Sequence, residues 1–256
     1  MEIAGKVVVI TGGAGGIGKS MARRFNIEGA AKVIIADQDR EHTSRVAAEI
    51  GVIGTVCDVT SEDSLNNMIT GIERDHGDID IFCSNAGIFR LGDENTPNDE
   101  WQTNWDVHVM AHVYAARNLA SKMAARGGGY LVNTSSAAGV LTHIDSVSYS
   151  VSKHAAVAFA EWLSITYGDR GVKVSVLCPQ AVRTPMIAGH EEEAASVDGI
   201  MEPEMLADVV IAALIREEFL ILPHEEVREY MRRKVLDPER WLTGMRRLRA
   251  RIAKEL

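Results

Sequence analysis

Short apolar runs alternate with longer segments of helical periodicity along the whole chain. The runs are rich in Val, Ile and Leu and are bounded by polar or glycine-containing segments, as is typical of strands buried on both faces of a sheet. They occupy residues 6–11, 32–36, 52–57, 80–84, 129–135, 173–178 and 219–223. Apolar residues recur at helical spacing over residues 16–28, 40–49, 62–75, 99–126, 148–169 and 204–216.

This alternation predicts an α/β fold with a parallel sheet covered by helices on both faces. Because crossovers between parallel strands are right-handed, we expect the doubly wound (Rossmann) arrangement. No internal repeat, low-complexity tract or linker divides the 256 residues. We therefore predict a single domain, with a Rossmann core over residues 1–223 and a C-terminal helical extension of the same domain over residues 224–256.

Two segments fall outside the alternation. Residues 186–202 lack a clear period and follow a strand, so we expect a mobile loop over a site. The chain after His224 predicts one or two amphipathic helices, broken at Asp237-Pro238 and rich in arginine. A solvated helix face explains this charge pattern. Among functional roles, docking onto another subunit is favoured over binding to a membrane surface or to nucleic acid.

Composition narrows the class of protein. A net charge of −9 disfavours nucleic acid as a partner, because phosphate binding needs a concentrated positive surface. No apolar stretch approaches the roughly 20 residues of a membrane span, and MEIAGKVVVITGG leads directly into a strand pattern without a signal peptide. The cysteines, which have neither metal nor disulfide spacing, are expected to be buried, reduced thiols: Cys57, Cys83 and Cys178. We expect a cytoplasmic protein without a metal site or a membrane partner.

A glycine-rich segment, TGGAGGIG, spans residues 11–18 between the first strand and the first helix. At such a turn backbone N–H groups can approach a pyrophosphate at the helix N-terminus, where the helix dipole favours anions. Two registers fit, one with Gly13, Gly15 and Gly18 and one with Gly12, Gly16 and Gly18. Glycines also serve plain tight turns, but their place between strand and helix favours dinucleotide binding.

An acidic residue, Asp37, ends the second strand. A carboxylate there can accept hydrogen bonds from ribose hydroxyls and would repel a 2′-phosphate, although a solvated strand-end aspartate is the alternative. The next residue is the neutral Gln38, and Arg40 is the one nearby cation. The pattern favours NAD over NADP.

A tyrosine and a lysine, Tyr149 and Lys153, lie four residues apart in a helical segment, so they share one helix face. A phenol with a pKa near 10 is a poor acid or base at neutral pH, and an adjacent ammonium lowers that pKa. Ser136 follows the strand at 129–135, at the sheet edge where α/β proteins bind ligands. Its hydroxyl could orient a substrate oxygen beside Tyr149.

Five motifs together resemble the short-chain dehydrogenase/reductase family, in its order and spacing, over about residues 5 to 223: TGGAGGIG, Asp58-Val59, Asn85-Ala86-Gly87, the strand ending at Ser136, and Tyr149-x-x-x-Lys153. The resemblance implies a nicotinamide cofactor and hydride transfer between it and an alcohol or ketone. Tyr149 would be the general acid/base, Lys153 would lower its pKa and hold the nicotinamide ribose, and Ser136 would polarise the substrate oxygen. Asp58 would contact the adenine and Thr184 the nicotinamide end. The full cofactor set comprises Gly12, Gly16, Ile17, Gly18, Asp37, Gln38, Asp58, Val59, Asn85, Ala86, Gly87, Tyr149, Lys153, Pro179, Val182 and Thr184.

Two positions depart from the family pattern. His108 stands where the family has an asparagine that supports a proton-relaying water, and Gln180 stands where it has a glycine. His108 could hold that water or relay protons, could be a poorer replacement that slows turnover, or could merely pack between helices. We count it with Ser136, Tyr149 and Lys153 as a catalytic candidate.

The leading hypothesis is an NAD-dependent oxidoreductase that interconverts a secondary alcohol and a ketone. The alternatives are an NAD-binding sensor or scaffold with weakened catalysis, and an NADPH-dependent 3-oxoacyl-type reductase, which Asp37 disfavours. The residues expected to border the pocket favour a mainly apolar substrate: Phe89, Leu91, Leu141, His143 and Met186. Glu191-Glu192-Glu193 disfavours polyanionic ones. By family resemblance, the chain is expected to form a homotetramer or homodimer.

Overall fold

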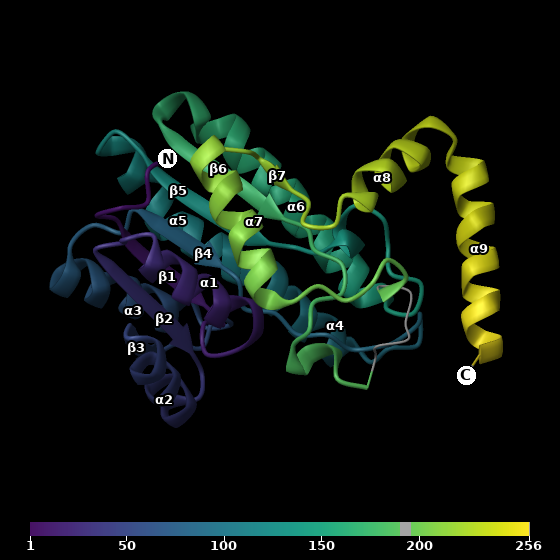
Figure 1. Cartoon of the computed structure of the whole chain (residues 1–256), viewed down its shortest axis with the longest axis horizontal. Helices are drawn as coiled ribbons and strands as arrows, with labels where there is room; N and C mark the ends of the chain where they lie inside the picture. The colour runs from purple at the N-terminus through teal and green to yellow at the C-terminus, as the bar shows by residue number, and fades with distance from the viewer. Residues whose placement is uncertain (190–195, 256) are drawn as a thin grey trace.

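The computed structural model describes residues 1–189 and 196–255, without the side chains of residues 253–255. Within these ranges seven strands form one sheet in the order β3-β2-β1-β4-β5-β6-β7 (Figure 1). They are β1 (Val7–Thr11), β2 (Lys32–Asp37), β3 (Ile53–Val56), β4 (Ile81–Ser84), β5 (Gly129–Thr134), β6 (Val172–Leu177) and β7 (Leu220–Ile221). Every pairing is parallel, which confirms the doubly wound fold. The strand order reverses between β1 and β4, so the carboxyl ends of these strands flank the crevice where such sheets bind ligands.

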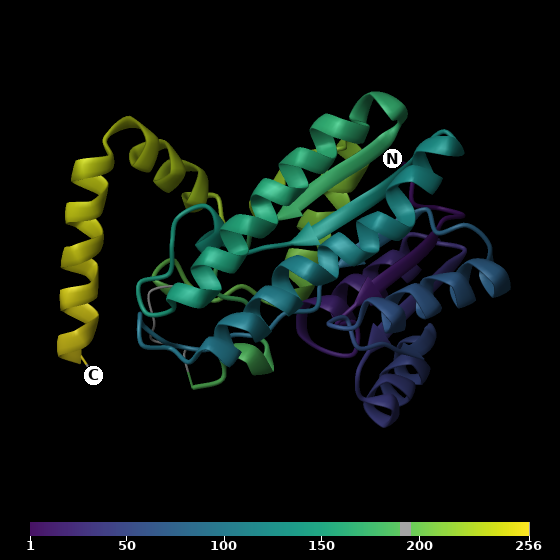
Figure 2. The ribbon, with the colours of Figure 1, turned by 180° about the vertical axis from the view of Figure 1, so that it is seen from behind.

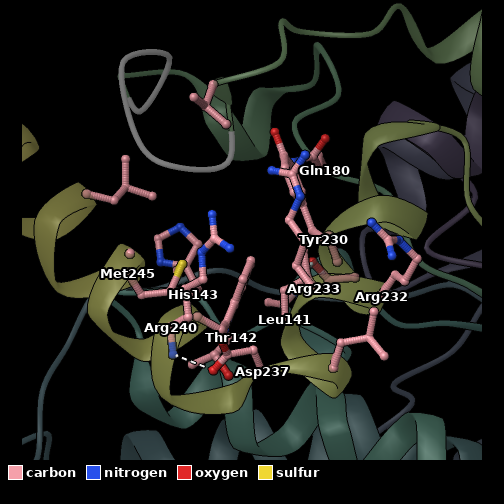
Figure 3. Close-up of a pocket in the computed structure, with 18 residues that line it drawn as sticks. Leu141, Thr142, His143, Gln180, Tyr230, Arg232, Arg233, Asp237, Arg240 and Met245 are labelled. Atoms are coloured by element: carbon pink, nitrogen blue, oxygen red, sulfur yellow. Dashed lines mark hydrogen bonds between the residues drawn. The ribbon is translucent and has the colours of Figure 1, made fainter.

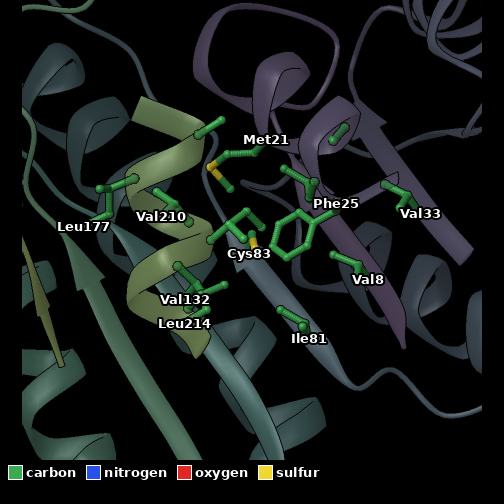
Figure 4. Packing of buried hydrophobic residues seen from close by; sticks show 14 of the residues in the cluster. Val8, Met21, Phe25, Val33, Ile81, Cys83, Val132, Leu177, Val210 and Leu214 are labelled. Carbon is green, nitrogen blue, oxygen red and sulfur yellow. The ribbon is translucent and has the colours of Figure 1, made fainter. Parts of the chain in front are cut away.

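Helices cover both faces of the sheet (Figures 1 and 2). Buried side chains of one face come from α1 (Gly16–Ile27), α2 (Arg40–Ile50) and α7 (Pro203–Arg216). Those of the other face come from α3 (Glu62–His76), α5 (Ala111–Ala125) and α6 (Val147–Tyr167). Side chains of β1 alternate between the two, with Val8 and Ile10 on the first face and Val7 and Val9 on the second. Figure 4 shows Met21 and Phe25 of α1 packed with Val210 and Leu214 of α7 on the first face.

The segment predicted as one helix over 99–126 contains an interruption. It is α4 (Asn98–Trp105), a π turn over Asp106–Met110, and then α5. Three consecutive residues of the π turn are buried, Val107, His108 and Val109. The sequence period alone did not reveal this turn.

The C-terminal extension forms an arm at the edge of the molecule (Figures 1 and 2). It consists of α8 (Glu226–Leu236) and α9 (Pro238–Glu255), which confirms the break expected at Asp237-Pro238. Within the segment 186–202, predicted as a mobile loop, residues 190–195 lie outside the described residues, and Glu191, Glu192 and Glu193 are among them. No helix in the described part of the chain is both long and apolar enough to cross a membrane.

Candidate active site

The turn between β1 and α1 brings backbone, rather than side chains, to the carboxyl edge of the sheet. Gly12 and Gly16 both have positive φ, at +62° and +48°. A Cβ on Gly12 would lie 2.8 Å from Ala86 Cα, and one on Gly16 would lie 2.9 Å from Thr184 Cγ2. Gly18 faces the Gly12 carbonyl, where a Cβ would not fit, so it packs the helix against the turn. Of the two registers, the one with Gly12 and Gly16 therefore contains the residues whose positive φ favours glycine.

The N-terminus of α1 is suited to an anion. No side chain caps it at Gly15, and no acidic residue lies in its first turn. Its first N–H groups are thus not bonded by a capping side chain, and the helix dipole favours negative charge there. A pyrophosphate fits this turn by both charge and space.

Two carboxylates lie beside the glycine turn. Asp37 ends β2, and its oxygens accept hydrogen bonds from the Ala14 N–H at 3.3 Å and the Gln38 N–H at 2.9 Å. Asp58 follows β3 and accepts from the N–H and the hydroxyl of Thr60 at 2.9 and 2.7 Å. These bonds hold both carboxylates at the edge where an adenosine would lie.

Thr11 fixes the chain segment that follows β4. Its hydroxyl oxygen accepts from the N–H groups of Asn85 and Ala86 at 3.0 and 3.2 Å, and Asn85 Nδ2 donates to the Thr11 carbonyl at 3.1 Å. The sequence reasoning did not single out Thr11, although it opens the glycine-rich segment. The Thr11 hydroxyl thus supplies the acceptor for both of these N–H groups.

Ser136, Tyr149 and Lys153 meet at the ends of β5 and α6. Ser136 Oγ accepts from the Ala138 N–H at 3.1 Å and donates to the Pro179 carbonyl at 3.4 Å, and the Ser136 hydroxyl lies near enough to the Tyr149 phenol to influence its pKa. Lys153 Nζ lies 5.5 Å from the centroid of the Tyr149 ring and donates to the Thr134 carbonyl at 3.0 Å. The structure thus brings the three predicted residues together.

Burial sets the pKa values of this group. It raises the pKa of Tyr149 to about 12, against the hydrogen bond with Ser136, which acts in the opposite direction. It lowers the pKa of Lys153 to about 7. The sequence predicted that Lys153 would lower the pKa of Tyr149, but desolvation of the phenolate is the larger influence in these surroundings.

His108 lies behind Tyr149, with the two rings perpendicular and their centroids 5.3 Å apart. Its Nε2 accepts from the Ile88 N–H at 3.1 Å, and its Nδ1 lies 2.9 Å from Ser152 Oγ, which donates to the Tyr149 carbonyl. These partners assign the proton to Nδ1 of a neutral ring. Burial, together with the nearby Lys153, holds the pKa of His108 well below its usual value. Ser152 is a further residue that sequence reasoning missed.

Two cavities meet beside Ser136. The first, which we call the nucleotide cavity, has a volume of about 400 Å³ and is lined by the glycine turn, Asp37, Asp58, Tyr149 and Lys153. The second, the substrate cavity, has a volume of about 730 Å³ and lies between the wall formed by residues 136–143 and the α8–α9 arm (Figure 3). Ser136, His143 and Gln180 line both.

Most of the predicted site residues line one of the cavities. The predicted cofactor residues in the nucleotide cavity are Gly12, Gly16, Ile17, Asp37, Gln38, Asp58, Val59, Asn85, Ala86, Gly87, Tyr149, Lys153, Pro179, Val182 and Thr184. Gly18 and His108 line neither and lie behind the surface. Phe89 and Met186 line the nucleotide cavity, Leu141 lines the substrate cavity, and Leu91 lies outside both.

Gln180 fits its place without a glycine. Thr142 and Glu217 are the non-glycine residues with positive φ in the described ranges, so Gln180 has an ordinary backbone conformation. Its N–H donates to His224 Nδ1 at 3.2 Å and its Nε2 to Asp198 at 3.0 Å. Asp198 also accepts from the Tyr230 hydroxyl of α8 at 2.9 Å. Gln180 therefore links the end of β6 to the α8–α9 arm.

No cluster of His, Cys, Asp and Glu that could hold a metal ion occurs among the described residues. The three cysteines are buried and free, as expected.

Similarity to known proteins agrees with this geometry. The family model for short chain dehydrogenase matches residues 6–195. The chain is 31% identical over 242 residues to 1-deoxy-11-beta-hydroxypentalenate dehydrogenase of Streptomyces exfoliatus, covering 91% of this chain and 88% of that one. It is 30% identical over 198 residues to 3beta-hydroxysteroid dehydrogenase 2 of Eggerthella lenta, covering 74% and 76%.

A solved structure shows the same fold. A short chain dehydrogenase/reductase of Burkholderia phymatum in complex with NAD superposes with a TM-score of 0.85 at 25% identity, covering 93% of this chain and 96% of that one. The matched family model, the parallel sheet and the glycine turn all lead to one assignment: the chain belongs to the short-chain dehydrogenase/reductase family of oxidoreductases.

Proposed function

We propose that the chain interconverts a secondary alcohol and a ketone with NAD as the hydride acceptor, and with Tyr149 as the general acid/base. The observation that carries this proposal is the placement of the Ser136 hydroxyl where the two cavities meet, beside the Tyr149 phenol whose pKa it lowers. Ser136 lines both cavities and Tyr149 lines the nucleotide cavity, so a carbinol that passes Ser136 from the substrate cavity can reach both hydroxyls.

Each residue of the group has a distinct task. Ser136 donates a hydrogen bond to the substrate oxygen and orients it, and Tyr149 takes the carbinol proton during oxidation or returns it during reduction. When Lys153 is protonated, its charge favours the Tyr149 phenolate that accepts this proton. Burial lowers the pKa of Lys153 to about 7, so Lys153 gains or loses its charge near neutral pH. When bound, the nicotinamide would supply the hydride chemistry.

NAD rather than NADP is proposed on the position of Asp37. Its carboxylate lines the nucleotide cavity beside Gln38, where it would accept hydrogen bonds from ribose hydroxyls and repel a 2′-phosphate. The similar Burkholderia structure is a complex with NAD, which is consistent with this choice.

An apolar substrate is proposed on the walls of the substrate cavity and on the relatives. Aliphatic and aromatic side chains supply much of its lining, including Leu141, Leu236 and Trp241. The two similar dehydrogenases are named for a hydroxypentalenate and a hydroxysteroid, both largely hydrocarbon alcohols.

The test is NADH formation with a panel of apolar secondary alcohols at mildly alkaline pH, repeated with NADP and, in reverse, with NADPH and a 3-oxoacyl thioester. Turnover with NAD on the alcohols is expected. Turnover confined to NADPH and the thioester would favour the 3-oxoacyl-type reductase. Tight NAD binding without turnover, unchanged in His108→Asn, would favour the sensor.

We further infer a homo-oligomer, a dimer or tetramer, on the surface of α6. Ala156 and Ala160 pack inside the core, but Val151, Trp162 and Ile165 are 46%, 55% and 82% exposed. Exposed apolar side chains gathered on one helix are consistent with an association surface. Sedimentation of the wild type and of Trp162→Glu should show an assembly that the substitution weakens; a monomeric wild type would contradict this.

A further inference from the structure

The substrate cavity has walls suited to a hydrocarbon. On α9, Trp241, Met245 and Leu248 recur at the spacing of one helix face, and all three line the cavity together with Ala138 and Leu141. A volume of about 730 Å³ lies in the range of pockets that enclose ligands of drug-like size. Because Ser136 lines the same cavity, a molecule lying along α9 can present a hydroxyl to the Ser136–Tyr149 pair.

The cavity also carries an excess of positive charge. Arg232, Arg233 and Arg240 line it, against one acidic residue, Asp237. Figure 3 shows Arg240 and Met245 of α9 on one side of the view and Arg232 and Arg233 of α8 on the other. The chain as a whole is acidic, so a cationic lining here is a local feature.

The arginines differ in their partners. Arg232 and Arg233 both pair with Glu229, at 2.7 and 2.9 Å. Arg240 forms no ion pair with any acidic side chain in the described part of the chain, and the Asp237 carboxylate accepts from its backbone N–H instead. The guanidinium of Arg240 is thus the charge in this lining that an anion can use.

We propose that the substrate is an apolar alcohol or ketone that carries a single carboxylate, and that this carboxylate pairs with Arg240 while the hydrocarbon lies against α9. A planar guanidinium matches a carboxylate with two parallel hydrogen bonds. One unpaired arginine matches one negative charge, whereas a polyanion would need more. The proposal rests on the proposed function for the identity of the reacting group, but the anion site can be tested without turnover.

The first experiment measures binding of decanoate and of the uncharged decanamide, below the concentration at which decanoate forms micelles. Quenching of tryptophan fluorescence gives the readout, and its loss in Trp241→Phe assigns it to the cavity. We expect decanoate to bind about five- to tenfold more tightly than decanamide, an order typical of a partly exposed charged hydrogen bond.

The matched variants are Arg240→Gln and Arg246→Gln. Arg246 lies on the same helix, hydrogen-bonds to Thr243 and does not line the cavity. The preference for decanoate should disappear in Arg240→Gln, with decanamide binding unchanged, and should persist in Arg246→Gln. Equal binding of the two probes to the wild type, or a preference that survives Arg240→Gln, would overturn the proposal.

The second experiment separates this proposal from the proposed function. Turnover of neutral alcohols together with equal binding of the two probes contradicts the anion site alone. A decanoate preference that depends on Arg240, with no turnover of any alcohol or hydroxy acid, contradicts the proposed function alone. If neither probe binds and Leu248→Glu splits an assembly, the apolar face of α9 belongs to a second copy of the chain and the proposal fails.

Discussion

The nucleotide cavity and the substrate cavity share three residues but are built from different parts of the chain. The glycine turn brings backbone to the first, where a Cβ added to Gly12 would lie 2.8 Å from Ala86 and one added to Gly16 would lie 2.9 Å from Thr184. Side chains of two helices form much of the second, where Gly244 of α9 would meet nothing if it gained a Cβ. A surface made of backbone restricts which residues can occupy it, whereas a surface made of side chains can change with its ligand.

The largest expected effect lies where the two cavities meet. Tyr149→Phe removes the phenol oxygen and leaves the ring, so kcat/KM should fall by roughly 10³-fold while the Kd for NADH changes less than about twofold. Steady-state kinetics and fluorescence titration of NADH measure the two quantities.

Tyr114→Phe is the matched control, because Tyr114 lies on α5 and lines neither cavity. It should keep both quantities near wild type. If Tyr149→Phe turned over within about tenfold of the wild type, Tyr149 would not be the group that transfers the proton. The chemistry would then not lie where the two cavities meet.

The same glycine-to-alanine change in each cavity tests the comparison directly. In Gly12→Ala the new Cβ meets the backbone at Ala86 and the residue is held at φ +62°, so NADH affinity should fall by roughly 10²-fold. In Gly244→Ala the Cβ enters open space within a helix, so affinity should not change and the free energy of unfolding should rise by about 0.5–1 kcal/mol. Titration calorimetry and denaturant unfolding provide the measurements. Equal losses of affinity would mean that the two cavities do not differ as described.

This difference also explains how much the sequence revealed. The alternating pattern predicted every strand. The glycine turn, Asp37 and Tyr149-x-x-x-Lys153 could be placed because their residue types stand at fixed positions relative to the strands and helices and together resemble the family's motifs. The α8–α9 arm was predicted as helices, but not as a wall of the site, since an amphipathic pattern does not say what its apolar face covers. The π turn at 106–110 and the burial that raises the pKa of Tyr149 depend on packing between segments distant in sequence.

A smaller effect is expected at the adenosine end of the nucleotide cavity. Asp37→Ser removes the carboxylate that would repel a 2′-phosphate, so the ratio of kcat/KM for NAD to that for NADP should fall by roughly tenfold or more. Glu41→Gln, an exposed acid of α2 that does not line the cavity, should leave the ratio unchanged. An unchanged ratio in Asp37→Ser would assign cofactor choice to other residues.

The smallest effect is expected behind the surface, at His108. Because its ring is neutral and bonded to Ile88 and Ser152, we expect it to support Tyr149 without changing charge during the reaction. His108→Gln keeps an acceptor and should lower kcat by about threefold. His108→Ala leaves the Ile88 N–H unpaired and should lower kcat by about tenfold, in line with the cost of an unsatisfied buried donor.

The pH profile separates this supporting role from a proton relay through His108. Burial holds the pKa of His108 well below its usual value, so the ring stays neutral throughout the neutral range. Any ionisation near neutrality in the profile of kcat/KM should therefore belong to Lys153, whose pKa is about 7, and should persist in His108→Gln, and any solvent isotope effect on kcat should be the same in the wild type and in His108→Gln. An inflection near pH 6.5 that vanishes in His108→Gln would show that the ring exchanges a proton during turnover. His108 would then take part in the proton transfer itself, instead of only supporting Tyr149 from behind the surface of the cavities.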